Sequence, residues 1–223
     1  MAQHYFRYVP KFDYVSRLSG SKNISDYNQV TNLFKRGKIR PDIFQDLSYF
    51  TKYKVIGDEQ PYQVAKKVYD DYNLDWLVLL ANNIINVTNE WPMDQISYDN
   101  YTLNKYGSYE NLYSVRHYET DHIKDSLGTT IVKKGLEVPQ NFSVSYYDRG
   151  LDRQITSNNV TYGVTNLEYE DRIQEERRNI FVLKSSYIGL VLDDLESIMP
   201  YKKGSTQYVS PSVVKGDNIR LYS

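Results

Sequence analysis

The chain contains no cysteine among its 223 residues. This absence excludes disulfide bonds, thiolate metal sites and thiol catalysis, so stability must come from packing and from contacts with partners. Histidine is scarce, with 3 residues, and the 11 glycines never form the spaced pattern of a phosphate-binding loop. A Gly-x-Ser-x-Gly nucleophile motif is missing too. The sequence therefore predicts a protein that is not an enzyme and that has no cofactor and no small-molecule substrate.

An excess of charge of one sign is also missing. Lys and Arg total 27 against 28 Asp and Glu, so no global field attracts a polyanion or an anionic membrane. The longest apolar stretches, residues 76–81 and 187–192, are far shorter than the roughly 20 residues of a membrane span. The N-terminus lacks the features of a secretory signal. We therefore expect no nucleic-acid or membrane partner, and a protein that stays in the cytosol or is built there into a particle.

Tyrosine is the residue that is abundant, with 23 copies against 7 Phe and 2 Trp. A tyrosine buries a large ring and keeps a hydroxyl for one hydrogen bond, which suits partly hydrated contact surfaces. The composition therefore favours extensive protein-facing surface. The alternative is that Tyr replaces Phe in ordinary strands.

Residues 1–50 combine aromatic and basic side chains without a sustained period, and this pattern predicts an extended N-terminal arm. Two alternatives stay open: the arm docks on a partner, or it packs on its own domain. The candidate protein-contact residues are the aromatic side chains Tyr5, Phe6, Tyr8, Phe12 and Tyr14.

A regular pattern begins at Thr51. Tyr53 and Val55 alternate with lysines, which predicts a half-buried strand, and a Gly-Asp turn follows. Pro61 suits the first turn of a helix, and Asn73 is its expected end. The apolar face of this helix comprises Val64, Ala65, Val68 and Tyr72. Together these signals predict a strand followed by an amphipathic helix.

A second helix is expected directly afterwards. Asp75 is a suitable N-cap, and residues 76–81 are almost wholly apolar. Asn82 and Asn83 are the expected end. A helix this short and apolar must be buried on more than one side, so residues 51–93 should form a small compact domain.

Residues 94–200 predict a mixed α+β region, and residues 201–223 predict a loose tail. The region begins irregularly. It should then contain short antiparallel strands near residues 113–117, 130–132 and 142–146, the last two joined as a hairpin around Gly135. Residues 168–178 predict a solvated helix with opposite charges paired along its surface. A buried strand at 180–183 and a helix at 186–199, stopped by Pro200, should follow.

One group of polar residues has the composition of a metal site: His117, Glu119, Asp121 and His122. On a strand, alternate members would share a face and could bring oxygen and nitrogen ligands together. Metal sites normally draw ligands from separate segments, however, and a surface strand explains the same residues. We therefore predict no metal, although a metal-dependent hydrolase is the alternative that these residues allow.

The segment from Tyr53 to Asn82 resembles a LysM module, a small strand-helix-helix-strand unit best known for binding peptidoglycan and chitin. Two departures stand out. The usual Thr-Leu after Gly-Asp is replaced here by residues 59–62, and no closing apolar strand follows Asn83. The residues that carry the resemblance, as the expected LysM-like core, are Tyr53, Val55, Gly57, Asp58, Ala65, Tyr69, Trp76, Leu79 and Asn82.

Taken whole, the chain resembles a baseplate wedge protein of T-even-like contractile-tailed bacteriophages, the small wedge subunit with a LysM-like domain. The resemblance lies in the aromatic start, the LysM-like segment with Trp91-Pro92 after it, and the late strand and helix at 180–199. It implies a virion protein, assembled in the host cytoplasm, that joins adjacent wedges of a hexagonal baseplate. Its partners would be other wedge and hub-proximal tail proteins. The alternative function is a LysM-type module that binds peptidoglycan.

Overall fold

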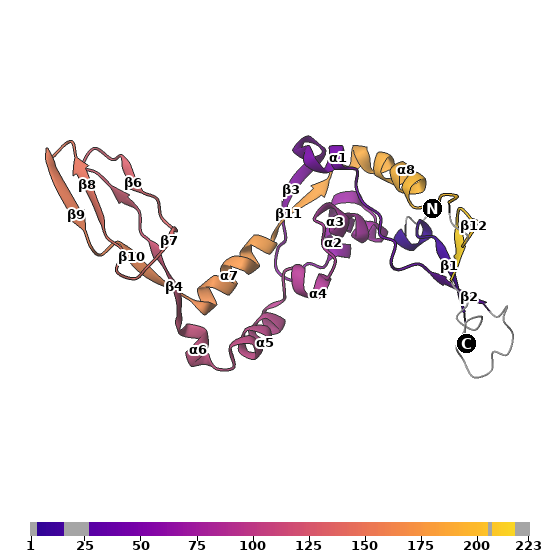
Figure 1. Ribbon diagram of the computed structural model, residues 1–223, viewed down its shortest axis with the longest axis horizontal. Coiled ribbons are helices and arrows are strands. Elements are labelled where there is room, and N and C mark those ends of the chain that lie inside the picture. Colours follow the sequence, from indigo (N-terminus) through magenta and orange to yellow (C-terminus); the bar gives the residue numbers. More distant parts are fainter. Residues whose placement is uncertain (1–3, 16–26, 205–206, 217–223) are drawn as a thin grey trace. The chain divides into compact units, whose positions relative to one another are not determined.

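The computed structural model describes residues 4–15, 27–204 and 207–216 (Figure 1). The chain divides into two units: unit 1 comprises residues 1–91 and 179–223, and unit 2 comprises residues 92–178. Unit 2 is thus inserted into the sequence of unit 1. Both units combine helices with small sheets, which confirms the predicted α+β class. Within the described part of the chain, every helix falls short of the length and hydrophobicity that a bilayer crossing requires.

Unit 1 has at its centre a two-stranded antiparallel sheet of β3 (Phe50–Lys54) and β11 (Asn179–Leu183). Helices α2 (Pro61–Tyr69) and α3 (Asp75–Ala81) pack beside this sheet. The other elements of unit 1 are η1 (Tyr5–Arg7), β1 (Lys11–Val15), β2 (Tyr27–Thr31), α1 (Pro41–Gln45), η2 (Leu47–Tyr49), η3 (Tyr72–Leu74), α4 (Val87–Glu90), η4 (Ser185–Tyr187), α8 (Ile188–Ile198), β12 (Tyr208–Ser210) and β13 (Val213–Lys215).

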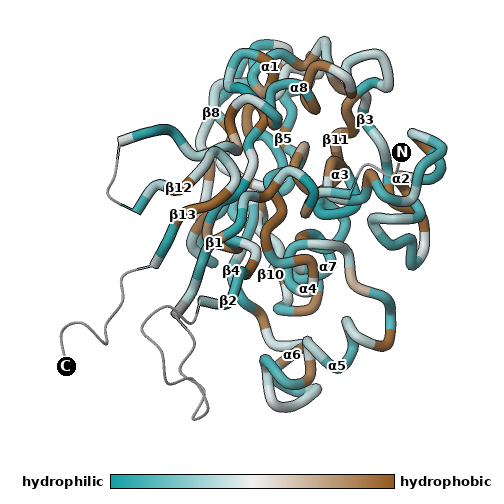
Figure 2. The backbone as a smooth tube through the Cα atoms, turned by 90° about the vertical axis from the view of Figure 1, so that its right-hand side faces the viewer, coloured by the Kyte–Doolittle hydropathy of each residue, from teal (hydrophilic) through white to brown (hydrophobic). Residues whose placement is uncertain are grey.

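The core of unit 1 lies between these helices and the sheet. Val64, Leu77 and Leu183 are completely buried there, and Figure 2 shows hydrophobic colouring along α3 and β11. Burying one such side chain stabilises a fold by about 1.5–3 kcal/mol. The apolar character of residues 76–81 is therefore explained, because α3 contacts both α2 and β11.

Helix boundaries follow local chemistry. Pro61 occupies the first position of α2, as predicted, and the Gln63 side chain accepts a hydrogen bond from the Gln60 amide at 2.8 Å. The predicted end at Asn73 is wrong. Asp70 adopts a left-handed conformation with φ at 59°, which stops the helix at Tyr69. Asp75 is the first residue of α3 and not its N-cap, although its carboxylate does accept from the Trp76 amide at 2.7 Å.

The described part of the N-terminal segment packs on unit 1. The rings of Tyr5 and Tyr8 lie with their centroids 5.6 and 6.3 Å from the Trp76 ring. The Gly37 amide donates to the Tyr5 hydroxyl at 2.8 Å, and Val9 is buried. Of the two alternatives for this segment, these residues show packing on the chain's own domain. Contact with a partner stays a prediction.

The expected loose tail requires a correction between residues 208 and 215. There β12 and β13 form part of a four-stranded sheet in the order β12-β13-β1-β2, and β13 runs parallel to β1, with Lys11 opposite Val213. Strands of three residues carry too little periodicity to be recognised, and their partner lies at the other end of the chain. The pairing therefore could not be read from the local sequence.

Unit 2 combines helices with one three-stranded sheet, in the order β10-β4-β7, and two hairpins, β5–β6 and β8–β9. Its elements are α5 (Gln95–Tyr106), α6 (Tyr109–Tyr113), β4 (Val115–Thr120), β5 (Ile123–Lys124), β6 (Thr130–Val132), β7 (Glu137–Val138), β8 (Val144–Asp148), β9 (Arg153–Ser157), β10 (Thr161–Thr165) and α7 (Asn166–Arg177).

Two predictions for unit 2 are wrong. Its irregular start is the helix α5, whose Asn, Ser and Tyr residues have weak helix propensity. The Asp94 side chain caps it by accepting from the Ser97 amide at 2.9 Å, and Gly107 ends it at φ 77°. The expected hairpin around Gly135 does not form either, because β6 pairs with β5 and β8 pairs with β9.

Helix α7 begins with a capping box that can be tested. The Glu168 amide donates to the Thr165 hydroxyl at 3.2 Å, and the Thr165 amide donates to the Glu168 carboxylate at 2.9 Å. Thr165→Ala should therefore cost unit 2 about 1 kcal/mol of unfolding free energy. Amide hydrogen exchange at the start of α7 measures this. Thr165→Ser keeps the hydroxyl and should exchange as the parent does; equal exchange in all three proteins would contradict the capping role.

Candidate protein-contact surface and polar network

The predicted N-terminal contact residues do not share one environment. Tyr5 and Tyr8 face Trp76, so their rings belong to the packing of unit 1. Phe6 is 63% exposed and Tyr14 is 44% exposed. Phe12 is half-buried beside Tyr14, with 6.3 Å between the ring centroids. The structure thus separates inward-facing rings from those that remain available for a partner.

A groove of about 570 Å³ lies on unit 1 next to these rings. Its apolar lining includes Phe6, Leu33, Trp76, Leu79, Ile84 and Ile85. Three of these, Phe6, Leu33 and Ile85, are 63%, 74% and 72% exposed, and Lys35 and Arg36 also line the groove. Sequence reasoning missed Leu33 and Ile85, because each is an apolar residue in a polar segment without periodicity. An exposed apolar rim of this kind is a mark of protein interaction.

The residues of the expected LysM-like core lie in β3, α2 and α3, in the turn between β3 and α2, and at Val55 and Asn82, which directly follow β3 and α3. Val55, Ala65 and Trp76 are buried. Gly57 and Asp58 lie in an exposed turn, where Gly57 has φ at +60°, a conformation that favours glycine. The half-buried members are Tyr53, Tyr69, Leu79 and Asn82. Except for the turn, these residues therefore lie in or beside the core that α2, α3 and the sheet enclose.

Asn82 links α3 to β11. Its side-chain amide donates to the Phe181 carbonyl at 2.8 Å, and its side-chain carbonyl accepts from the Phe181 amide at 2.8 Å. The same NH₂ group also donates to the Val78 carbonyl at 2.8 Å. One side chain therefore satisfies both backbone groups of a residue on β11 that lies far away in the sequence.

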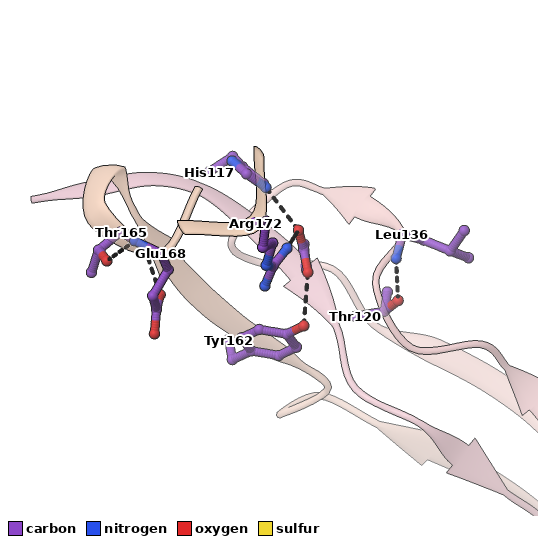
Figure 3. A network of polar contacts seen from close by, with 8 residues as sticks. His117, Thr120, Leu136, Tyr162, Thr165, Glu168 and Arg172 are labelled. Atoms are coloured by element: carbon purple, nitrogen blue, oxygen red, sulfur yellow. Dashed lines mark hydrogen bonds and ion pairs between the residues drawn. The ribbon is translucent and has the colours of Figure 1, made fainter. Parts of the chain in front are cut away.

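In unit 2, the side chains of His117 and Glu119, from the group that was considered as a metal site and rejected, do meet. Figure 3 shows His117, Tyr162 and Arg172 pointing at one carboxylate. This is Glu119, which is only 6% exposed. His117 Nε2 lies 2.9 Å from its Oε1, the Tyr162 hydroxyl donates to its Oε2 at 2.7 Å, and Arg172 Nη1 donates to Oε1. Strand β10 and helix α7 thus complete the environment of a carboxylate on β4.

Opposing influences act on the Glu119 carboxyl. Burial disfavours the charged form and is the largest single influence. The hydrogen bonds from Arg172, His117 and Tyr162, with the charge of Arg172, outweigh it and lower the pKa of Glu119 to about 2. Glu119 is therefore an ionised acceptor at neutral pH that holds β4, β10 and α7 together.

The other two members of this polar group have different partners. Asp121 and His122 are exposed. The Asp121 carboxylate accepts from the His122 amide at 2.8 Å, and the His122 ring lies 3.1 Å from the Thr130 hydroxyl. No group of three or more His, Cys, Asp or Glu side chains suited to a metal ion occurs among the described residues.

The prediction of a solvated helix at 168–178 with charges paired along its surface is right about the helix and right in part about its charges. Arg178 Nε lies 4.0 Å from Glu175 Oε2, as expected for residues three apart, but other charged side chains pair outside the helix. Glu170 is 3% exposed and accepts from Lys105 Nζ at 2.7 Å and the Tyr106 hydroxyl at 2.8 Å. The Tyr98 hydroxyl donates to Asp171 at 2.6 Å. Burial and this hydrogen bond raise the pKa of Tyr98. Glu170, Asp171 and Arg172 of α7 thus contact residues of α5 and β4. Part of the tyrosine content serves internal hydrogen bonds between tyrosine and carboxylate.

A comparison with protein families identifies the chain. Residues 5–198 match a family model of the phage tail base plate, which defines a class: a structural, non-enzymatic component of the virion tail. The chain belongs to the base plate wedge protein 53 family, since the match covers most of its length. This confirms the family predicted from the sequence and the prediction that the protein is not an enzyme. None of the curated proteins matches the chain.

Proposed function

We propose that the chain joins adjacent wedges of the base plate, by contacts with other wedge and hub-proximal tail proteins during assembly. The family supports assembly with other base plate proteins in general. The observation that carries the finer proposal is the exposed apolar rim of the unit 1 groove, Phe6, Leu33 and Ile85. Apolar side chains left exposed around a groove gain free energy when a partner covers them.

The N-terminal aromatic residues have two different roles in this proposal. Tyr5 and Tyr8 anchor the segment on Trp76, and this leaves Phe6 and Tyr14 exposed. An anchored segment loses little further conformational freedom when a partner binds, so its exposed rings contribute more to affinity. Phe6 and Tyr14 are thus the proposed contact residues from the N-terminal set.

We also propose that β3, α2, α3 and β11 form a LysM-like strand-helix-helix-strand unit, with unit 2 inserted before the closing strand. The antiparallel register from Phe50 opposite Leu183 to Lys54 opposite Asn179 supports this order. The two hydrogen bonds between Asn82 and Phe181 support it as well. The missing closing strand after Asn83 would then be residues 179–183. In this proposal the unit is a scaffold for protein contacts and not a glycan-binding site.

The contact surface can be tested with the double variant Phe6→Ser/Leu33→Ser of the full chain. Removing two exposed hot-spot candidates should weaken incorporation into base plate wedges at least about tenfold. The measurement is co-sedimentation of purified chain with wedge assemblies that lack it. Leu47→Ser is the matched control, because Leu47 is 64% exposed in unit 1 but does not line the groove.

Three possible results distinguish a groove that binds a protein from a groove without a role in assembly and from a groove that binds glycan. Loss of incorporation by the double variant, with Leu47→Ser unaffected, supports the proposal. Equal incorporation of all three proteins contradicts the role of the groove. Firm retention of the parent chain on peptidoglycan, abolished in the double variant, would assign the groove to glycan and also contradict it. Cross-linking mass spectrometry on intact tails then identifies which neighbours contact the groove.

A further inference from the structure

Unit 2 carries a rigid double loop, here called the tip loops: residues 125–129 between β5 and β6, and residues 149–152 between β8 and β9. The two hairpins run next to each other in Figure 1. Asp148, at the end of β8, is only 2% exposed. Its carboxylate accepts from the Ser126 amide at 2.9 Å, the Ser126 hydroxyl, the Gly150 amide at 3.0 Å and the Leu151 amide at 3.1 Å. One buried acid thus fixes both loops to each other.

The loop between β5 and β6 is also ordered from within. The Asp125 carboxylate accepts from the amides of Leu127 at 3.0 Å and Thr129 at 2.6 Å. Gly128 adopts φ at 82°, and its amide donates to the Asp125 carbonyl at 3.0 Å. The loops also approach closely, because a Cβ on Gly150 would lie 3.1 Å from Leu127 Cδ2. The tip loops therefore present a defined shape before any partner arrives.

Two leucines remain uncovered on this rigid base. Leu127 is 66% exposed and Leu151 is 50% exposed. Each follows a residue that Asp148 holds, since Ser126 precedes Leu127 and Gly150 precedes Leu151. The hydrogen bonds account for the order of the loops. They do not account for the exposure of the two leucines to water. Preorganised apolar side chains of this kind bind with little loss of conformational freedom.

The charged side chains around the leucines differ in whether they already have partners within unit 2. The carboxylates of Asp125 and Asp148 accept hydrogen bonds from the loops, and Asp152 accepts from the Tyr147 hydroxyl. For the cations Lys124, Arg149 and Arg153, by contrast, no ion pair is found among the described residues. The tip loops therefore combine an apolar centre with three cations that have no ion pair among the described residues, beside three carboxylates that keep their charge but are hydrogen-bonded within unit 2.

We infer that the tip loops are a second docking surface, which inserts Leu127 and Leu151 into an apolar pocket rimmed by carboxylates on another base plate protein. The inference rests on the family's role in an assembly, and it adds a contact on unit 2 to the groove proposed on unit 1. Charge complementarity selects an acidic rim on the partner, because Lys124, Arg149 and Arg153 would pair with it. A rigid pair of leucines suits a preformed protein pocket better than a fluid lipid surface.

The absence of cysteine provides a direct test. Leu127→Cys places one thiol in the full chain, and its maleimide labelling rate can be compared between free protein and assembled base plates. We expect labelling to slow at least about tenfold on assembly, as for a side chain buried in an interface core. Leu136→Cys is the matched control, since Leu136 is 51% exposed in unit 2 outside the tip loops. Equal labelling of Leu127→Cys in both states would overturn the inference.

The chemistry of the partner is tested separately. The charge-reversal variant Arg149→Glu/Arg153→Glu should weaken incorporation into wedges about tenfold or more, and the loss should be smaller at high salt. Incorporation equal to the parent would overturn the acidic rim. Binding of the free chain to phosphatidylglycerol vesicles, lost in Leu151→Ser, would assign the loops to lipid and overturn the protein partner. If Leu127→Cys stays reactive while Phe6→Ser/Leu33→Ser fails to assemble, this inference fails and the proposed function stands.

Discussion

Replacing Asn82 with Ala is expected to lower the unfolding free energy of unit 1 by about 3 kcal/mol. The substitution removes the hydrogen bonds to both backbone groups of Phe181 and the bond to the Val78 carbonyl. Leaving a partly buried donor and acceptor unsatisfied costs about 1–3 kcal/mol each. Both tryptophans, Trp76 and Trp91, lie in unit 1. Tryptophan fluorescence during urea unfolding therefore measures this unit selectively.

Two further variants make the Asn82 result specific. Asn82→Asp keeps an acceptor for the Phe181 amide but places a carboxylate oxygen against the Val78 and Phe181 carbonyls, so its loss of stability should be at least as large as that of Asn82→Ala. Asn89→Ala is the matched control, because Asn89 is exposed on α4 and no side-chain hydrogen bond is found for it among the described residues. Its effect should stay within about 0.5 kcal/mol. A parent-like midpoint for Asn82→Ala would show that β11 is held without this link, which would weaken the LysM-like proposal.

Replacing Arg172 with Met is expected to destabilise unit 2 by about 2 kcal/mol at neutral pH. Glu119 would keep Tyr162 and His117 as partners but lose its guanidinium, and a buried carboxylate without a cation is costly. The value is below the roughly 3–5 kcal/mol of a fully buried pair, because the Arg172 side chain is 47% exposed and partly hydrated. Hydrogen exchange of peptides from residues 92–178 measures unit 2, which contains no tryptophan.

The pH dependence of this variant has a definite sign. The folded-state pKa of Glu119 is about 2, below its ordinary 4.5. The stability that Glu119 contributes is thus fully present above pH 4.5 and is lost as the pH falls toward 2. Arg172→Met raises that pKa, so the difference between parent and variant should shrink over this window. A difference that stays constant from neutral pH to pH 2 would contradict the proposed pairing.

Arg177→Met serves as the control on the same helix. No ion pair is found for Arg177 among the described residues, so its replacement should change stability by less than about 0.5 kcal/mol. Tryptophan fluorescence should be unchanged in both arginine variants, because it reports unit 1. A shift of the fluorescence midpoint in Arg172→Met would show that the effect is not confined to unit 2.

The sequence alone was most informative where local periodicity and local chemistry agree. The helix starting at Pro61 was predicted and is present, and so is the strand at Tyr53, although β3 ends at Lys54, one residue before Val55. The buried strand at 180–183 was predicted and is present as well. An apolar face or an alternation reports which side of an element is buried, and that side must be covered in any fold. The helix α5 was missed because its evidence lies in the cap at Asp94 and the stop at Gly107, not in an apolar pattern.

The sequence by itself determined the chemistry that is available: no thiol, balanced charge, abundant tyrosine and a family of structural proteins. Only the tertiary structure decided which groups meet. It paired β11 with β3 across an inserted unit, brought Arg172 and Tyr162 to Glu119, and joined two loops through Asp148. Local patterns specify a face but not a partner, because contacts between distant segments depend on how the whole chain closes. The same reason explains why the exposed rims of the groove and the tip loops emerge only in three dimensions.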